Sequence, residues 1–375
     1  EDADGHPRLV VNSDETYIYN YRVMDRAGTY WYHPHPHGRT GPQVYRGLAG
    51  LFLIHDDQEA SLDLPAGEHD LPIVIQDRIF DDDNQLVYNI SGRMPQMFGM
   101  LGDQVLVNGS PEYNLKVQRG AYRLRLMNGS NARIYKLAWE DGTPLTVIGT
   151  EGGLLEKPVV RDYVTLAPAQ RIDLWVDFGN WEPGETLRMI SLPSAAPGSA
   201  REKSIFTASV QDSEVQRVSL PGAFPQHQAL DPDEAVNANA PRSFDLHMGR
   251  GMRWMINGRQ FSMTDVARDE RVALGDVEVW EFTNQGSAGR GMGRMMDQMS
   301  QPHPMHVHGL QFKIIDRKID PADEGPYETL KDGFVDEGWH DTVLVMPGER
   351  VRIVMRFEDY RGLYLYHCHN LEHED

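Results

Sequence analysis

Cysteine is nearly absent from this sequence, which has a single one, Cys368, among 375 residues. One cysteine excludes an internal disulfide framework and a structural zinc site built on several thiolates. Long apolar runs are absent too, so no membrane-spanning helix is expected. The lone thiol is therefore a buried spectator, a nucleophile or a metal ligand.

Basic residues are in short supply. Lys and Arg total 36 against 56 Asp and Glu, which gives a formal net charge of −20. Such a surface repels nucleic acid and anionic membranes and favours cationic partners, metal ions included. The alternative is that the charge serves only to keep the protein soluble. We therefore expect neither a nucleic-acid partner nor a membrane partner.

Segments of helical period long enough for an α/β fold are also missing. In their place, 35 Gly and 23 Pro separate many short apolar runs such as "DLPIVIQDRIF" and "QRIDLWVDF", a pattern typical of β-sandwiches. The stretch "PGAFPQHQALDPDEAVNANAPRS" has the composition of an interdomain linker. The sequence predicts an all-β protein in three parts, at residues 1–60, 68–225 and 242–375.

Histidine is what the chain has in quantity. It has 15, and nine of them fall in the short clusters "WYHPHPHG", "HPMHVHG" and "HCHNLEH". Because side chains in a strand alternate between faces, His-x-His puts two imidazoles on one face, where they can grip one metal or two adjacent metals. The pairs of this kind are His33/His35, His306/His308 and His367/His369. Together they supply too many imidazoles for one mononuclear ion.

Cys368 lies between two of these histidines. Its side chain should point away from those of His367 and His369, so that the thiolate can bind one metal while its neighbours bind others. Thiolate with two imidazoles is typical of an electron-transfer copper site, and His303 and His373 are left over from the pairs as natural partners. Cys368 and its neighbouring histidines would form a short covalent path between two metal sites. Zinc is redox-silent and would not need such a path, whereas copper would use it.

Each cluster alone has a less specific interpretation. "HCHNLEH" could be a histidine-rich edge strand, and "HPHPHG" could be a surface loop or a fragment of a zinc hydrolase. A hydrolase would normally add a nearby carboxylate ligand, which "HPHPHGRTG" lacks. The three clusters together favour copper.

These motifs and their surroundings resemble bacterial multicopper oxidases of the laccase and cuprous-oxidase kind. The resemblance is carried by "TYWYHPHPHGRTGPQVYRGLAGLFLIHDD", "HPMHVHGLQFKIIDR", "GWHDTVLVMPGERVRIVMRF" and "YHCHNLEHED", and it covers nearly the whole chain. It implies three cupredoxin-like domains, each a Greek-key β-sandwich, the first of them incomplete at its N-terminus. It also implies one-electron oxidation of a reducing substrate at a type 1 copper. Four-electron reduction of O₂ to water would follow at a trinuclear cluster of one type 2 and two type 3 coppers.

The resemblance assigns copper ligands residue by residue. The type 1 ligands that it implies, within residues 242–375, are His303, Cys368 and His373. The remaining ligands that it implies are His306 for the type 2 ion, and His33, His35, His308, His367 and His369 for the type 3 ions. Asp4 and Glu374 match carboxylates beside the trinuclear site, where they can relay protons. The alternative for each is an ordinary surface carboxylate.

Two departures from the family concern the ends of the chain. The family has four His-x-His pairs and this chain shows three, so the missing pair would precede Glu1. The axial type 1 residue, often Met, would follow Asp375. We therefore interpret the chain as a partial sequence. A chain that truly lacked two ligands would instead be a non-catalytic copper-binding or electron-transfer cupredoxin protein, and a copper nitrite reductase relative is a further alternative.

The reductant has two alternatives under this resemblance: phenols and aromatic amines, or Cu(I). Thioether sulfur suits Cu(I), although Met also fills irregular packing. The methionines that could bind extra Cu(I) lie in "GMGRMMDQM" and are Met292, Met295, Met296 and Met299. A protein of this kind is expected in the periplasm or outside the cell.

Overall fold

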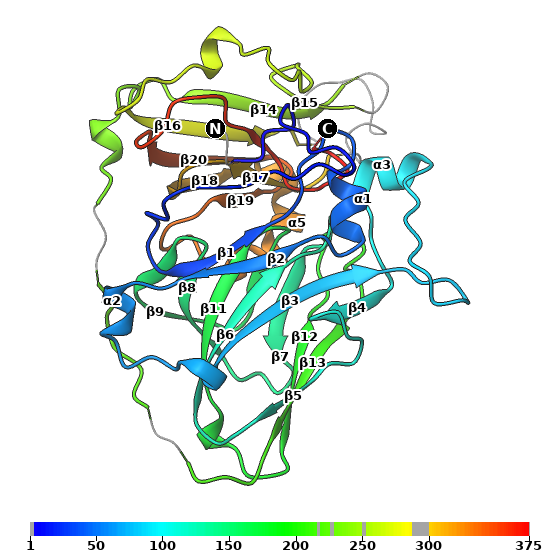
Figure 1. The fold of residues 1–375 in the computed structure, drawn as a ribbon, viewed down its shortest axis with the longest axis vertical. Helices are drawn as coiled ribbons and strands as arrows, with labels where there is room; N and C mark the ends of the chain where they lie inside the picture. The colour runs from blue at the N-terminus through cyan, green and yellow to red at the C-terminus, as the bar shows by residue number, and fades with distance from the viewer. Residues whose placement is uncertain (1–3, 216–217, 226–228, 250–252, 287–299, 375) are drawn as a thin grey trace.

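A computed structural model describes the chain except for residues 1–3, 216–217, 226–228, 250–252, 287–299 and 375. Strands dominate this described part, and the expectation of an all-β protein is confirmed. Figure 1 shows the strands in two stacked bodies, with β1 and β2 between them. The methionines proposed for Cu(I), Met292, Met295, Met296 and Met299, lie outside the described residues.

The first part of the chain forms an antiparallel pair of strands, β1 (Gly28–Tyr32) and β2 (Gly50–Ile54). The sequence of β1, GTYWY, consists mostly of residues that favour strands. Helix α1 (Thr40–Tyr45) connects the two strands, and α2 (Asp57–Ala60) follows them. Since β1 ends one residue before His33, it carries the first histidine cluster with it.

The middle of the chain forms two sheets, which we call the central sheets. The six-stranded sheet has the order β4 (Gln104–Val107), β3 (Asp70–Arg78), β6 (Ala121–Asn128), β11 (Arg171–Asp177), β8 (Leu145–Thr150) and β9 (Gly153–Arg161). The five-stranded sheet has the order β10 (Val164–Leu166), β7 (Tyr135–Trp139), β12 (Thr186–Ser191), β13 (Lys203–Val210) and β5 (Asn114–Val117). Helix α3 (Arg93–Phe98) lies between β3 and β4 in the chain. One apolar core, with Leu124 and Phe206 among its buried members, joins the sheets.

Arginines occupy the other face of β6. In this strand Tyr122, Leu124 and Leu126 belong to the core, so the alternating Arg123 and Arg125 point the opposite way. Both are nevertheless buried, because the first part of the chain covers them. Arg123 pairs with Glu59 of α2 at 2.8 Å, and Arg125 donates to the Thr29 hydroxyl of β1 at 3.0 Å. A buried ion pair therefore fastens α2 to the central sheets, and a buried hydrogen bond fastens β1.

The last part of the chain forms the C-terminal sheets. The larger has the order β15 (Trp254–Ile256), β14 (Arg242–Met248), β16 (Val277–Asn284), β20 (Glu349–Arg356) and β18 (Phe312–Ile319). The smaller has the order β19 (Thr342–Val345), β17 (His303–Val307) and β21 (Tyr366–Cys368). Helix α5 (Glu324–Glu328) follows β18. Short 3₁₀ turns lie at Gly67–His69, Phe178–Asn180, Pro232–Glu234, Arg268–Glu270, Pro321–Asp323 and Lys331–Gly333. We propose that the three expected parts, 1–60, 68–225 and 242–375, are separate domains.

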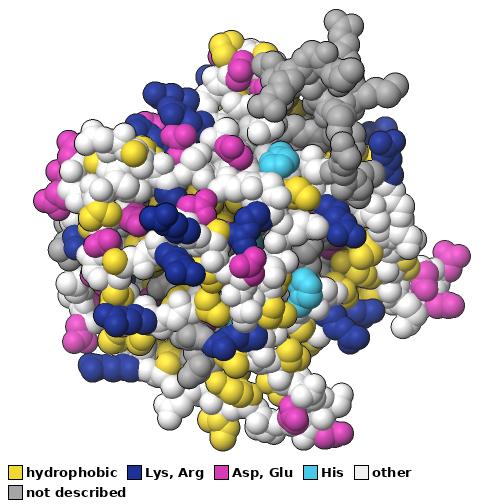
Figure 2. Space-filling model, turned by 90° about the horizontal axis from the view of Figure 1, so that it is seen from above, with side chains coloured by type: hydrophobic (Ala, Val, Ile, Leu, Met, Phe, Trp, Pro, Cys, Tyr) yellow, Lys and Arg dark blue, Asp and Glu magenta, His cyan; other side chains and the backbone are white. Residues whose placement is uncertain are grey.

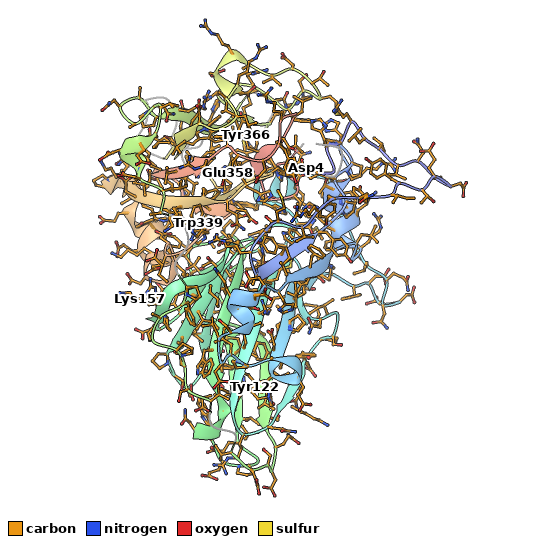
Figure 3. The ribbon with its side chains drawn as sticks, turned by 60° about the vertical axis from the view of Figure 1, so that its left-hand side comes forward. Asp4, Tyr122, Lys157, Trp339, Glu358 and Tyr366 are labelled. Atoms are coloured by element: carbon orange, nitrogen blue, oxygen red, sulfur yellow. The ribbon has the colours of Figure 1, made fainter. Side chains whose placement is uncertain are left out.

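The junction between the central and C-terminal sheets contains a buried histidine, His340. Its Nδ1 donates to Glu151 Oε2 at 2.7 Å, and both side chains are 2% exposed. The adjacent Trp339 carbonyl accepts hydrogen bonds from Thr150 Oγ1 at 2.8 Å and from the Gly152 amide at 2.9 Å. Figure 3 shows Trp339 where the two bodies meet. Burial alone would lower the pKa of His340, but the Glu151 carboxylate outweighs it and the pKa is raised.

We expect this junction to weaken as the pH rises. The pKa of an unfolded histidine is about 6.5, and the folded-state pKa of His340 lies above it. Its stabilising contribution is therefore fully present below pH 6.5 or so and is lost as the pH rises through the folded-state pKa. The measurement is thermal unfolding of the metal-free protein at a series of pH values. The difference in stability between wild type and His340→Gln should shrink as the pH rises through the folded-state pKa of His340. A gap that stays constant would contradict the assignment.

Candidate metal centre

Strand pairing brings the second and third histidine clusters together. β17 lies between β19 and β21, and in its antiparallel register with β21 His306 faces His367 and Met305 faces Cys368. The first cluster reaches the same place from β1. Because the side chains of β21 alternate, Cys368 and His367 contribute to two different groups of side chains on opposite sides of the strand.

The first group, which we call the sulfur site, consists of His303, Cys368 and His373. One nitrogen or sulfur atom from each lies within 4.8 Å of the others, and all three side chains are buried. His303 Nδ1 is 3.3 Å from Cys368 Sγ. His373 donates from Nε2 to the Met97 carbonyl at 3.0 Å, which leaves its Nδ1 with no hydrogen-bond partner among the described residues. Trp254 packs against both imidazoles, with ring centroids 4.5 Å and 4.6 Å away.

The second group, which we call the imidazole cluster, consists of His33, His35, His306, His308, His367 and His369. His367 Nε2 is 3.1 Å from His308 Nε2 and 3.4 Å from His35 Nε2. His33 and His369 approach in the same way, with their Nε2 atoms 3.3 Å apart. The ring of His306 lies 5.5 Å from that of His367 and 5.7 Å from that of His369. Ring nitrogens from all three sequence clusters thus converge.

Burial controls the charge of these groups. It is the main cause that lowers the pKa of His33 to about 4 and of His303 to about 3, so both imidazoles are neutral at neutral pH and keep a lone pair for a metal. Burial also raises the pKa of the Cys368 thiol to about 12. A bound metal would displace that proton, so metal binding at the sulfur site releases one.

Both groups fit copper. A thiolate with two imidazoles is the donor set of a blue-copper site, and the unpartnered His373 Nδ1 is a lone pair that a cation would satisfy. In the imidazole cluster, ring nitrogens face one another, an arrangement that a cation between them stabilises. The sulfur site and the imidazole cluster are joined by the bond between Cys368 and His367.

Both carboxylates expected from the sequence lie against the imidazole cluster. Glu374 Oε1 is 3.0 Å from His35 Nε2, and its side chain is 1% exposed. Asp4 Oδ2 accepts from His308 Nδ1 at 3.2 Å. Figure 3 shows Asp4 beside the C-terminal sheets, although these sheets lie far from Asp4 in the sequence. Neither carboxylate is an isolated surface group.

The histidine clusters are only partly shielded from solvent, because His33, His35, His306 and His308 are half-buried and His37 is exposed. Figure 2 shows mixed acidic and basic side chains on the upper face, with only isolated histidines reaching the surface. His303, His367, His369 and His373 are all less than 9% exposed. A cavity of about 700 Å³ reaches both groups, and its wall includes His303 and His308.

A cover from the central sheets lies over the sulfur site, which the sequence did not predict. This α3 cover, residues 88–101, places the Met97 carbonyl on His373. Glu372 holds the cover in place by accepting hydrogen bonds from Tyr88 Oη at 2.9 Å and from the Met100 amide at 2.8 Å. A backbone carbonyl leaves no mark in a sequence, so no sequence signal pointed to this contact.

Gly99 makes the fit of the α3 cover possible. Its φ of +78° lies in the left-handed region, and a Cβ at this position would collide with Ala132 Cβ and the Asn370 side chain. Asn370 also donates from Nδ2 to the Phe98 carbonyl at 3.2 Å. The cover therefore contacts Asn370 and Glu372, which lie between Cys368 and His373.

Comparison with known proteins agrees with this geometry. Sequence profiles described as multicopper oxidase match residues 2–59, 70–192 and 235–375. A laccase from Bacillus stratosphericus is 31% identical over the whole of this chain and 76% of its own length. The multicopper oxidase mco of Staphylococcus aureus is 30% identical, over the whole chain and 72% of its own length.

Solved structures show the same likeness. The McoA multicopper oxidase of Aquifex aeolicus superposes with a TM-score of 0.82 at 36% identity, over 99% of this chain and 79% of that one. A laccase from Pediococcus acidilactici superposes with a TM-score of 0.81 at 32% identity, over 100% of this chain and 73% of that one. The expected fold class, cupredoxin-like β-sandwiches, is confirmed by these structures.

Proposed function

This chain belongs to the multicopper oxidase family, and on that premise we propose how its side chains divide the work of a copper-dependent oxidoreductase that uses O₂ as acceptor. When bound, the coppers supply the electron transfer that couples oxidation of a reducing substrate to reduction of O₂ to water. One observation carries the division of roles: neighbouring residues of one strand, His367 and Cys368, serve two buried donor groups.

The sulfur site would hold the type 1 copper. His303, Cys368 and His373 are all buried, and Cys368 belongs to the apolar core of the C-terminal sheets. The hydrogen bond from His373 Nε2 to the Met97 carbonyl fixes the tautomer that leaves Nδ1 for the metal. The thiol needs the metal to lose its proton, so we expect copper to bind more weakly as the pH falls.

The imidazole cluster would hold the trinuclear copper. His306 is the type 2 ligand that the family resemblance implies. Its Nδ1 donates to the Asp341 carbonyl at 2.8 Å, which supports a ligand role because its Nε2 is left for the metal. The proposed type 3 ligands are His33, His35, His308, His367 and His369. A group of six imidazoles exceeds what the single catalytic copper of a nitrite reductase would need.

Glu374 and Asp4 are the proposed proton donors for the reduction of O₂. Each lies within hydrogen-bond distance of a cluster histidine, Glu374 on His35 and Asp4 on His308. The carboxyl of Glu374 is buried and can hold a proton at Oε1, the atom nearest the cluster. Asp4 would orient His308 through Nδ1 and exchange protons with water.

The reductant class belongs to the proposal. Phenols, aromatic amines and Cu(I) all donate single electrons, and each would deliver them towards His373 or His303. The methionines suggested for Cu(I), Met292 to Met299, lie outside the described residues, so the choice rests on kinetics.

We also propose a periplasmic or extracellular location, since a copper-handling protein with one ligating thiol suits an oxidising compartment. None of the described helices is long and apolar enough to cross a membrane.

The test of this function is direct. The purified protein, loaded with copper, should show the intense blue band of a Cys–Cu(II) site, EPR signals of two distinct copper types, and O₂ uptake with a phenol or with Cu(I). The ratio of the two rates identifies the reductant class. One blue copper without O₂ uptake would contradict the oxidase and leave an electron-transfer or copper-binding protein.

We expect Gly99→Ala to change which reductants the protein accepts. A Cβ at Gly99 pushes the α3 cover off Asn370 and uncovers the His373 edge. Activity with a bulky phenol should rise several-fold relative to the small donor hexacyanoferrate(II), measured as kcat/KM for each. Gly142→Ala is the matched control, because Gly142 has nearly the same φ, +79°, with no neighbouring atom in reach of a Cβ. Equal ratios in both variants would show that the cover has no part in selecting reductants.

A further inference from the structure

Arg171, the first residue of β11, links segments that lie far apart in the sequence. It is 2% exposed, and its guanidinium donates hydrogen bonds in three directions. Two go to the Asp341 carboxylate, at 2.8 Å and 2.6 Å. One goes from Nε to the Thr29 carbonyl at 2.8 Å, and one from Nη1 to the Ala169 carbonyl at 2.9 Å.

The Asp341 side of this contact leads to His306. His306 Nδ1 donates to the Asp341 carbonyl at 2.8 Å and lies 3.0 Å from Thr342 Oγ1. Thr342 Oγ1 in turn donates to Asp341 Oδ1 at 2.8 Å. Arg171 therefore fixes the carboxylate, the carboxylate orients the threonine hydroxyl, and the two residues together hold the imidazole.

The Thr29 side leads to the first histidine cluster. Thr29 lies in β1, which runs directly into His33 and His35. Its hydroxyl donates to Asp173 Oδ1 at 2.9 Å, so β1 is fixed to β11 through both its backbone and a side chain. One guanidinium thus touches the strand that leads to His33 and His35, and it also touches the carboxylate of Asp341, whose backbone carbonyl accepts from His306.

We propose that Arg171 is a positioning residue that aligns the histidines of the first part of the chain with His306 of the last part. The inference rests on the proposed function and deepens it, because it assigns a role in the trinuclear site to the central sheets, which supply none of the proposed ligands. Arginine suits the role better than lysine. Its planar fork binds a carboxylate through two nitrogens while Nε reaches a third oxygen, whereas an ammonium is a point charge on a flexible chain.

Arg171→Lys tests the alignment while keeping the charge. Outer partners of metal ligands typically contribute about 10- to 100-fold to metal affinity, so the variant should lose cluster copper to a chelator at 10- to 100-fold lower concentration than wild type. The type 2 EPR signal should change in shape. The blue band should stay, because the Arg171 guanidinium donates to Asp341, Thr29 and Ala169, none of which belongs to the sulfur site.

Arg133→Lys is the matched control. Arg133 is also 2% exposed, and it binds the Asp77 carboxylate at 2.7 Å and the carbonyls of Gly198 and Gly102. It should lose as much thermal stability in the metal-free protein as Arg171→Lys, yet keep its copper and its EPR spectrum. Equal copper loss in the two variants would reduce Arg171 to a general structural role and overturn the proposal.

A milder variant guards against misfolding. Thr342→Val keeps the side-chain size and removes the hydroxyl that lies between Asp341 and His306. Thr342→Val should alter the type 2 EPR signal in the same direction as Arg171→Lys does, but by a smaller amount. Wild-type copper retention and EPR spectra in both Thr342→Val and Arg171→Lys would overturn the inference alone, whereas a wild type whose imidazole cluster takes up no copper would overturn the proposed function with it.

Discussion

Cys368→Ser should abolish the blue absorption and bring substrate oxidation to the background rate. Serine fills nearly the same space, but its hydroxyl is a poor ligand for copper in a site built from soft sulfur and imidazole. The sulfur site would keep only His303 and His373, whose ring nitrogens lie within 4.8 Å of the former sulfur position. Copper content should fall by about one ion per chain, which metal analysis of the dialysed protein measures directly.

The same variant separates the two groups of ligands. His367 and His369 are unchanged in Cys368→Ser, so the imidazole cluster should still bind copper and show its own EPR signal. Met305→Leu is the control, since Met305 pairs with Cys368 across the strands, is fully buried, and can be replaced at similar volume. A blue band that survives Cys368→Ser would mean that the thiol is a spectator.

Glu374→Gln should slow O₂ consumption by about 10²- to 10⁴-fold, the usual contribution of a positioned proton donor. Glutamine preserves the shape of the side chain, but at Oε1, 3.0 Å from His35 Nε2, it has no acidic proton to give. The blue band and the anaerobic rate of electron uptake from a phenol should be those of wild type. The loss should therefore appear in kcat with O₂ and in its pH profile, and hardly in the KM for the phenol.

Glu349→Gln is the control for the general effect of replacing a buried glutamate by glutamine. Glu349 is fully buried in the C-terminal sheets and binds Arg317 at 3.0 Å, remote in sequence from the proposed ligands. It should lower the free energy of unfolding without changing the pH profile.

Asp4→Asn should slow turnover in the same step as Glu374→Gln. Unchanged turnover in both Asp4→Asn and Glu374→Gln would refute the proton relay.

The spacing of histidines was enough to predict that a metal centre exists. His-x-His in a strand has a defined geometry, and the pairing of β17 with β21 brings two such pairs side by side. Which pairs meet could not be worked out from local pattern, because strand pairing between distant segments is a tertiary property. The family resemblance supplied that information and the ligand assignments with it.

The parts that the sequence could not predict are contacts without a residue signature. The Met97 carbonyl on His373 is a backbone atom, so any residue could provide it. Arg123 and Arg125 alternate with apolar residues in β6, a pattern that normally indicates a solvated face. They are buried because α2 and β1 cover them, and only the folded chain shows that cover.

The imidazole cluster also has a consequence for biosynthesis. His33 and His369, whose Nε2 atoms lie 3.3 Å apart, are separated by 336 residues. At the ribosome's pace of about 5–20 residues per second, roughly 20–70 s pass between the emergence of the first and of the second. During that interval the nascent chain displays His-x-His pairs that no partner closes, and any available transition metal can occupy them. We therefore expect metallation of the proposed cluster to be complete only after translation has delivered β21.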